Sequence, residues 1–285
     1  MMKYRFFCIA VSLCIWMGTA WGSPVGNIAD PACLSSGVFT HERPNGIFAG
    51  MEADFSTDRD YQLQTGDITL NTYGTRIGAI LGNNIMIYGF AGVSEYEDNK
   101  YIISYYLPDS PDRSEAVNSL KIATDPDFVY GAGITAVMYE HKVNEGVFLR
   151  IGLDVNYRRL ELEDTEAVMY HTVYNHPDPT NRGRQITPNV NYTLRLDDYQ
   201  GALSLSYQVD NFVPYFGFLV MESRGNETIE VPNDDYYYYN GDILLEQNKG
   251  YFVGISYNYS NKLSLNVEAR NRSESAITCR VLVRF

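Results

Sequence analysis

Apolar and polar side chains alternate strictly over long segments of this chain, and this alternation is what most constrains its fold. In Val147–Arg158, one parity carries Val147, Leu149, Ile151, Leu153, Val155 and Tyr157, and the other carries Phe148, Arg150, Gly152, Asp154, Asn156 and Arg158. Because successive side chains of a β-strand point to opposite faces, the segment predicts a strand with one face suited to lipid and the other suited to water.

The same alternation extends along the chain and predicts about ten strands. It is clear at 46–56, 201–209 and 262–271, and further strands are expected at about 68–81, 85–96, 127–140, 212–222, 250–259 and 275–285. Two weaker segments, 100–107 and 166–174, would raise the number to twelve. Short turns are expected near 81–85, 140–147, 209–212 and 259–262, and long polar loops at roughly 97–126, 161–195 and 223–248. Bacterial outer-membrane barrels have this asymmetry of tight periplasmic turns and long outer loops.

A membrane barrel explains these strands better than a soluble β-sandwich, whose strands tend to be shorter. Several segments reach the ~9–11 residues that a tilted membrane strand needs. Aromatic residues also gather toward strand ends, where interfacial girdles form; they are Tyr88, Phe90, Tyr96, Tyr207, Tyr257 and Tyr259. We therefore predict an all-β fold, a transmembrane antiparallel up-and-down β-barrel over residues 46–285.

The first 22 residues predict a secretory signal peptide. Lys3 and Arg5 precede an apolar stretch over 6–17, and Ala20 and Gly22 supply small residues before a cleavage site. Residues 23–45 are then a pre-barrel segment. Beyond residue 22 no apolar run approaches the ~20 residues of a membrane helix, so a spanning domain would have to be a closed barrel. The expected location is the bacterial outer membrane, in contact with its lipid and with the barrel-assembly machinery.

The chain is strongly acidic, with a formal net charge of −13. Removing the predicted signal peptide removes two of the 22 basic residues and none of the 35 acidic ones, so the remaining charge is 20 − 35 = −15. Such a chain is a poor partner for nucleic acid. Acidic residues concentrate in 161–166 and 222–242, which we interpret as solvated surface in preference to a cation-binding site.

Strand parity predicts which charged side chains line the lumen of the barrel. They are Glu52, Asp54, Arg76, Arg150, Asp154, Arg158, Glu268, Arg270, Arg280 and Arg284. Charges are tolerated on the lumen face of a barrel and costly on its lipid face. Either these side chains line an aqueous pore and set its ion selectivity, or they fill the interior with ion pairs, as in barrels of about eight strands.

Two cysteines remain after cleavage of the signal peptide, in an oxidising compartment where disulfides form. Cys279 shares the parity of Ile277 and Val281 and is expected on the lipid face as a small apolar side chain. Cys33, in the pre-barrel segment, either forms an intermolecular disulfide or stays a single thiol.

No catalytic, metal or cofactor site is predicted. His171 and His176 share a loop with Asp178 and lie near Glu166, and proteases at a barrel rim do use pairs of His and Asp, but no motif surrounds these residues. The spacing of the two histidines is not typical of a zinc site, and the chain has no CxxC. We expect that the protein is not an enzyme.

Three segments resemble the chlamydial major outer membrane protein porins. Pro24–Pro31 is similar to the family's mature N-terminus, Asp198–Gly217 to its pattern of a strand, a short turn and a strand entered through Pro-Tyr, and Lys262–Phe285 to its closing hairpin. Weaker matches cover 81–92 and 131–157. The chain looks like a divergent, shortened member with few cysteines, and Phe285 resembles the C-terminal assembly signal of outer-membrane proteins. The resemblance implies an oligomeric porin for small hydrophilic solutes in a cysteine-crosslinked envelope.

The function expected from these features is passive diffusion of small hydrophilic solutes and ions through an outer-membrane porin. The alternative is a structural or adhesive surface protein whose barrel anchors acidic, tyrosine-rich loops. The run Asp234–Tyr239 would then contact a host or envelope protein from a loop tip.

Overall fold

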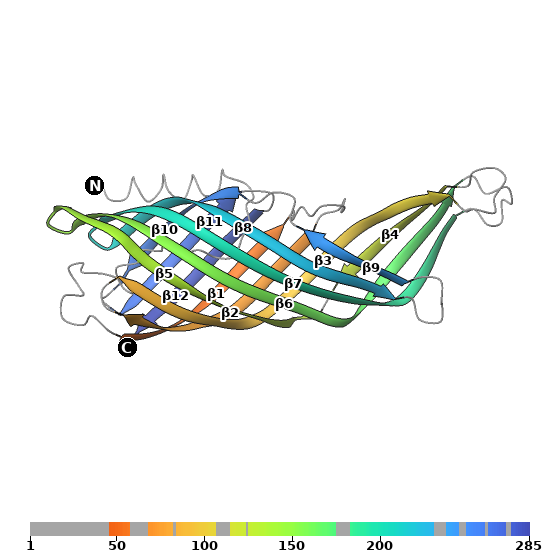
Figure 1. Ribbon diagram of the computed structural model, residues 1–285, viewed down its shortest axis with the longest axis horizontal. Helices are drawn as coiled ribbons and strands as arrows, with labels where there is room; N and C mark the ends of the chain where they lie inside the picture. Colours follow the sequence, from red (N-terminus) through yellow and green to blue (C-terminus); the bar gives the residue numbers. More distant parts are fainter. Residues whose placement is uncertain are drawn as a thin grey trace.

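The chain forms a closed antiparallel β-barrel with an extended wall at one end (Figure 1). The computed structural model describes residues 46–57, 68–81, 84–106, 115–123, 125–174, 183–230, 238–244, 249–259, 262–271 and 275–285. The strands are β1 (Gly46–Thr57), β2 (Ile68–Leu81), β3 (Ile85–Tyr106), β4 (Glu115–Ala123), β5 (Asp127–Asn144), β6 (Val147–Tyr174), β7 (Gly183–Val209), β8 (Phe212–Glu230), β9 (Tyr238–Leu244), β10 (Lys249–Asn258), β11 (Leu263–Asn271) and β12 (Ser275–Arg284). Within these ranges there is no helix long and apolar enough to cross a membrane.

Ten of the strands close the barrel. In the order β1, β2, β3, β5, β6, β7, β8, β10, β11 and β12, each strand pairs antiparallel with the next. Strand β12 then pairs with β1, from Thr57↔Ser275 to Phe48↔Arg284, so the sheet has no edge at this level. These ten strands coincide with the ten segments expected from the alternation, and the predicted fold class is confirmed.

The two remaining strands extend the wall at one end of the barrel. Strand β4 pairs with the outer parts of β3 and β6, whereas β5 pairs with their inner parts, so β4 and β5 run in line. The line is interrupted near Asp125 and Pro126, where the proline has no N–H to donate to the ladder. Strand β9 pairs with the outer part of β8 in the same way that β10 pairs with its inner part.

The long loops predicted at 97–126, 161–195 and 223–248 are in large part strands, which corrects the sequence prediction. The segments 100–107 and 166–174 are likewise the outer ends of β3 and β6 and not separate strands. On these outer parts the alternation is inverted: Leu160 and Leu162 are buried inside, while Arg159 and Glu161 point outward. A strand whose outer face meets water lacks the outward apolar positions that mark a lipid-facing strand, so its sequence resembles a polar loop.

Two short turns on the opposite end of the barrel are confirmed by their backbone geometry. Gly146, between β5 and β6, has φ 74°, and Asp210, between β7 and β8, has φ 53°. Two-residue hairpin turns need such positive φ values because their twist must match that of the strands. The two turns also touch, since the Asp210 N–H donates to the Gly146 carbonyl at 3.2 Å.

Gly92 of β3 is a glycine that barrel closure requires. A Cβ atom at this position would lie 2.2 Å from the Tyr73 carbonyl oxygen and 2.6 Å from the Gly74 Cα atom, and both are backbone atoms. We expect Gly92→Val to lower the free energy of unfolding by about 3 kcal/mol, the upper part of the range for overpacked sites. Urea unfolding in detergent micelles, followed by circular dichroism, measures the loss. The matched control is Gly201→Ala, whose Cβ meets no atom within 4 Å; equal stability of the two variants would contradict this account.

Candidate functional site in the barrel interior

The barrel interior holds all ten charged side chains that strand parity placed on the lumen face. Each of them is at most 8% exposed. The set is Glu52, Asp54, Arg76, Arg150, Asp154, Arg158, Glu268, Arg270, Arg280 and Arg284. The alternation of side chains between the two faces is a local property of each strand. When the sheet closes into a barrel, all side chains on the inner face point toward one another.

Arg270 is the centre of the first ion-pair network. Its Nη2 atom lies 2.5 Å from Asp54 Oδ1 on β1, across the intervening strand β12, and its Nη1 atom lies 3.2 Å from Glu268 Oε1. Arg270 Nη1 also donates to the Thr278 hydroxyl at 2.7 Å, and that hydroxyl donates to Asp54 at 2.7 Å. The Tyr215 hydroxyl donates to Glu268 Oε2 at 3.1 Å. Four strands are therefore held together by one buried guanidinium and its two carboxylates.

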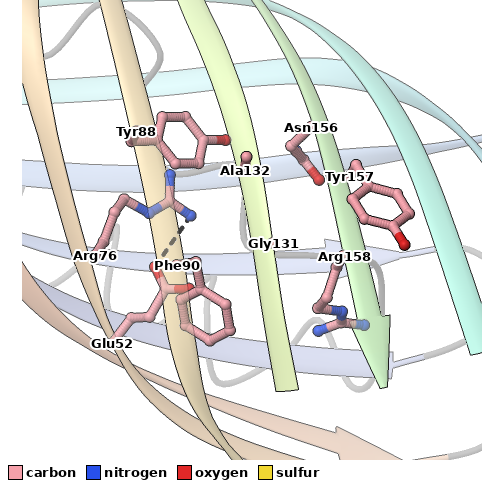
Figure 2. A pocket seen from close by; sticks show the side chains of 9 residues that line it. All are labelled: Glu52, Arg76, Tyr88, Phe90, Gly131, Ala132, Asn156, Tyr157 and Arg158. Atoms are coloured by element: carbon pink, nitrogen blue, oxygen red, sulfur yellow. Dashed lines mark ion pairs between the residues drawn. The ribbon is translucent and has the colours of Figure 1, made fainter. Parts of the chain in front are cut away.

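Glu52 is the centre of the second network. Its Oε2 atom accepts from Arg280 Nε at 2.9 Å and lies 3.1 Å from Arg76 Nη2. Figure 2 shows the Arg76 guanidinium between Glu52 and the Tyr88 ring, whose centroid is 4.0 Å from Arg76 Cζ. The Tyr88 hydroxyl donates to Asp154 Oδ2 at 3.1 Å, which links β3 to β6 across β5. Two more side chains, one on β5 and one on β6, also donate hydrogen bonds to the Asp154 carboxylate.

Two further pairs lie along β6. Arg158 Nη2 is 2.9 Å from Asp198 Oδ2, and the Ser223 hydroxyl donates to the other oxygen of Asp198 at 2.5 Å. At the turn end of the barrel, Arg150 Nε lies 2.5 Å from Glu140 Oε2, and Arg150 Nη1 donates to the Gln208 side chain at 2.8 Å. The interior is thus cross-linked along its length.

The charges of the buried interior are balanced. Among the described residues, the buried carboxylates number six and the buried guanidinium groups also number six. The carboxylates are Glu52, Asp54, Asp154, Asp198, Glu227 and Glu268, and the guanidinium groups are Arg76, Arg150, Arg158, Arg270, Arg280 and Arg284. A buried charge is tolerated when it is paired and hydrogen-bonded. The acidic excess of the chain therefore belongs to its other surfaces.

A layer of apolar side chains, which we call the outer plug, fills the interior beyond the ion pairs. It consists of Leu70, Phe90, Tyr96, Ile122, Val129, Leu160, Leu162, Tyr192, Leu194, Leu196, Ile229 and Ala276. The rings of Tyr96 on β3 and Tyr192 on β7 stack with centroids 6.1 Å apart, although these strands are not neighbours. The outer plug therefore spans the lumen. Sequence reasoning missed it because Leu162, Tyr192 and Ile229 lie on segments that were expected to be loops, and because the rings of Phe90 and Tyr96 were assigned to a girdle.

The opposite end of the interior is also apolar. Phe48, Ile80, Met86, Val137 and Leu282 form a buried cluster around the Tyr88 ring. Between the two apolar layers lies a small pocket, with a cavity volume of about 20 Å³, that is partly open to solvent. Its lining includes Glu52, Arg76, Asn156 and Arg158 (Figure 2).

The outer surface of the barrel carries an apolar belt with aromatic residues at both margins. Along β6 the outward positions from Val147 to Tyr157 are apolar, and along β7 those from Tyr199 to Val209 are apolar apart from Gly201. Tyr157 and Tyr199 meet at the outer margin with ring centroids 5.2 Å apart, and Phe212 and Tyr257 meet at the turn margin at 4.9 Å. An outward apolar band with two aromatic girdles is typical of transmembrane β-barrels.

Several predicted positions can be compared with this surface. Tyr207, Tyr257 and Tyr259 point outward as predicted, but Tyr88, Phe90 and Tyr96 are buried inside, so their assignment to a girdle was wrong. These three residues have the inward parity of β3, and their rings fill the lumen. Cys279 faces outward, as predicted, and is free. Phe285 is 69% exposed, and its N–H donates to the Ile47 carbonyl at 2.9 Å.

The remaining predicted positions give no site. Cys33, His176, Asp178 and the predicted signal peptide lie outside the described residues. His171 is in β6, opposite Gln185, and its side chain is not among those described. Within the part of the chain that the structure describes, no group of three His, Cys, Asp or Glu side chains could hold a metal ion. The expectation that the protein is not an enzyme stays a prediction.

A closed ten-strand antiparallel barrel with an apolar exterior and a polar interior is the architecture of bacterial outer-membrane β-barrel proteins. Among solved structures, the chain is similar to the outer membrane protease OmpT from Escherichia coli, with 14% identity over 85% of this chain and 98% of that one and a TM-score of 0.48. It is also similar to the CymD monoaromatic hydrocarbon channel (7% identity, 94% of both chains, TM-score 0.36) and to Omp33 of Acinetobacter baumannii (9% identity, 84% and 98%, TM-score 0.22). No protein-family model and no curated protein sequence matches the chain. The resemblance to chlamydial porins stays a prediction.

Proposed function

We propose that this protein is a sealed outer-membrane barrel that anchors a strand-built extension on the cell surface, where it acts as a structural or adhesive protein. The observation that carries the proposal is the filling of the interior by paired charges and by the outer plug. The proposal thus favours the alternative expected from the sequence over the diffusion channel.

The lengths of the strands support an extension beyond the membrane. Strands β6 and β7 contain 28 and 27 residues, whereas a tilted strand crosses the bilayer in about 9–11. The apolar belt ends at Tyr157 on β6 and at Tyr199 on β7, so the rest of each strand lies beyond the belt. Figure 1 shows β3, β4, β6 and β7 running together to the end farthest from the C-terminus, and β8 and β9 ending short of it. Short turns mark the periplasmic side of such barrels, so we expect the extension to lie on the outside of the cell.

The energetics of the interior support a closed lumen. An aqueous pore would require the charged side chains to be hydrated, as in the charged rings of ion channels. Here Arg270 and Glu268 are 1% and 0% exposed and are bonded to each other and to neighbouring side chains. Leaving one charge of a buried ion pair without its partner costs about 3–5 kcal/mol, so the paired arrangement of these side chains is strongly favoured.

Passive diffusion through the lumen is the second candidate function. The pocket in Figure 2 favours it, because Arg76, Arg158 and Glu52 present charged groups to a space that is partly open to solvent. A channel would need this space to continue past the outer plug. One measurement separates the two candidates.

Bilayer conductance tests the sealed barrel. We expect the refolded protein, inserted into planar bilayers in concentrated KCl, to give no conductance steps, since paired charges and apolar side chains block the lumen. Insertion is verified in the same sample by the folded band on unheated gels. Regular conductance steps from a verified sample would establish the diffusion channel and refute the sealed lumen. In addition, an epitope inserted between β6 and β7 should bind its antibody on intact cells.

A further inference from the structure

Strand β9 (Tyr238–Leu244) forms an edge of the extended wall (Figure 1). All of its residues pair with β8, from Glu230↔Tyr238 to Arg224↔Leu244. Strand β10, which runs in line with β9, is paired on its other side with β11, but β11 ends at Asn271, below the level of β9. In the part of the chain that the structure describes, no strand pairs with the second side of β9.

The backbone of an edge strand is a binding surface for another strand. About half of its N–H and C=O groups point away from its one partner strand, and they can pair with an extended segment of another chain. Proteins commonly protect such an edge with lysine, proline or a β-bulge. Strand β9 contains no lysine and no proline, and its pairing with β8 runs without a register shift. The sequence and geometry of β9 are therefore compatible with strand addition.

The segment that carries this edge is acidic. Residues 225–248 include six carboxylates, of which one is buried, and no Lys, Arg or His. The nearest cations in the sequence are Arg224 and Lys249, and including both still leaves a formal charge of 2 − 6 = −4. Glu230 at the end of β8 and Asp242 on β9 are exposed. The edge of β9 therefore has charge complementarity to a cationic partner.

We propose that the edge of β9 binds an extended segment of a partner protein that is rich in Lys and Arg, and that this segment joins the sheet as a further strand. The inference deepens the proposed function and rests on it, because the partner reaches β9 only if the extension lies outside the cell. Backbone hydrogen bonds would fix the position of the bound segment, and the surrounding carboxylates would select its cationic side chains.

Two further properties of β9 favour this partner. The strand begins with Tyr238 and Tyr239, and tyrosine rings attract the cations of Lys and Arg. A second copy of the chain is a poorer partner, because it would bring two acidic segments together, and like charges on neighbouring strands are destabilising. We therefore assign the edge to a cationic segment of a different protein.

Peptide binding in non-ionic detergent tests the proposal. The refolded full chain is titrated into a fluorescent peptide of alternating lysine and threonine, and binding is followed by fluorescence anisotropy. One control peptide has glutamate in place of lysine, and a second keeps the lysines but has every backbone amide N-methylated, so that it has no N–H to donate. We expect the unmodified lysine peptide to bind about tenfold more tightly than either control, or better, because only it offers both the hydrogen bonds and the charge.

Two protein variants locate the binding site. Glu230→Gln/Asp242→Asn removes two exposed carboxylates at the edge and should weaken binding of the lysine peptide about fivefold, the effect of two exposed charge pairs. The matched control Glu95→Gln/Glu97→Gln removes two carboxylates from the outside of β3 and should bind the peptide as wild type does. The folded band on unheated gels verifies each variant.

Three outcomes would overturn the proposal. Equal binding of the N-methylated peptide would exclude strand addition, and equal affinities of the two variants would place the binding elsewhere. Self-association of the wild-type protein that the lysine peptide reverses would assign the edge to a second copy. Because the assay contains no membrane, its failure leaves the sealed barrel untouched, whereas conductance steps in bilayers would refute the sealed barrel and leave the peptide result standing.

Discussion

Arg270→Met should lower the free energy of unfolding by about 3–5 kcal/mol, the usual cost of removing one partner from a buried ion pair. The substitution leaves Asp54 and Glu268 buried without the guanidinium that lies between them, while the Thr278 and Tyr215 hydroxyls can compensate only part of the charge. Both tryptophans of the sequence lie in the predicted signal peptide. Unfolding in urea is therefore best followed by circular dichroism and by the mobility shift on unheated gels.

Two comparison variants make the Arg270 prediction specific. Arg224→Met removes the same side chain from an exposed pair and should cost under about 1 kcal/mol. The triple variant Arg270→Met/Asp54→Asn/Glu268→Gln removes all three charges and should recover part of the lost stability, because no uncompensated charge remains. If Arg270→Met costs no more than Arg224→Met, the network does not hold the interior together and the sealed lumen loses its main support.

Leu203→Arg should destabilise the protein in lipid vesicles by about 2–4 kcal/mol, the cost of an arginine at the bilayer midplane on the lipid face of a barrel. Leu203 is 49% exposed and lies near the middle of the apolar belt on β7, between Tyr199 and Val209. The side chain points away from the barrel, so the new charge meets acyl chains and not the paired charges inside. Urea titration of the vesicle-inserted protein gives the difference.

The control for Leu203→Arg places the same charge beyond the belt. Thr228 of β8 points outward above Arg224, and Thr228→Arg should change the stability by no more than about 0.5 kcal/mol. Comparable costs for the two variants would show that the belt does not face lipid. That result would refute the membrane location on which the proposed function depends.

Strand parity allowed much of the candidate site to be predicted. The ten charged residues expected on the lumen face are all inside, because a strand alternates its side chains whatever it pairs with. The alternation of a strand does not predict with which residues these charged side chains form ion pairs. Arg270 and Asp54 are separated by 216 residues, and the distance between their side chains depends on the closure of β12 on β1. Whether the inward-facing charged side chains line a pore or fill the barrel is likewise decided by side-chain contacts across the lumen.

The sequence by itself determined which segments are lipid-facing strands, which of their faces is apolar, and where the short turns lie. These are local properties, set by the direction of successive side chains and by the backbone of a two-residue turn. Only the tertiary structure showed that Tyr96 and Tyr192 meet across the lumen, that the acidic segments continue as paired strands, and that β4 and β9 lengthen the wall. Such features depend on the curvature of the closed sheet, which brings together side chains that are distant in sequence. They also depend on the solvent outside the wall: beyond the belt the outer face meets water and not lipid, so the apolar side chains lie on the inner face of the strands.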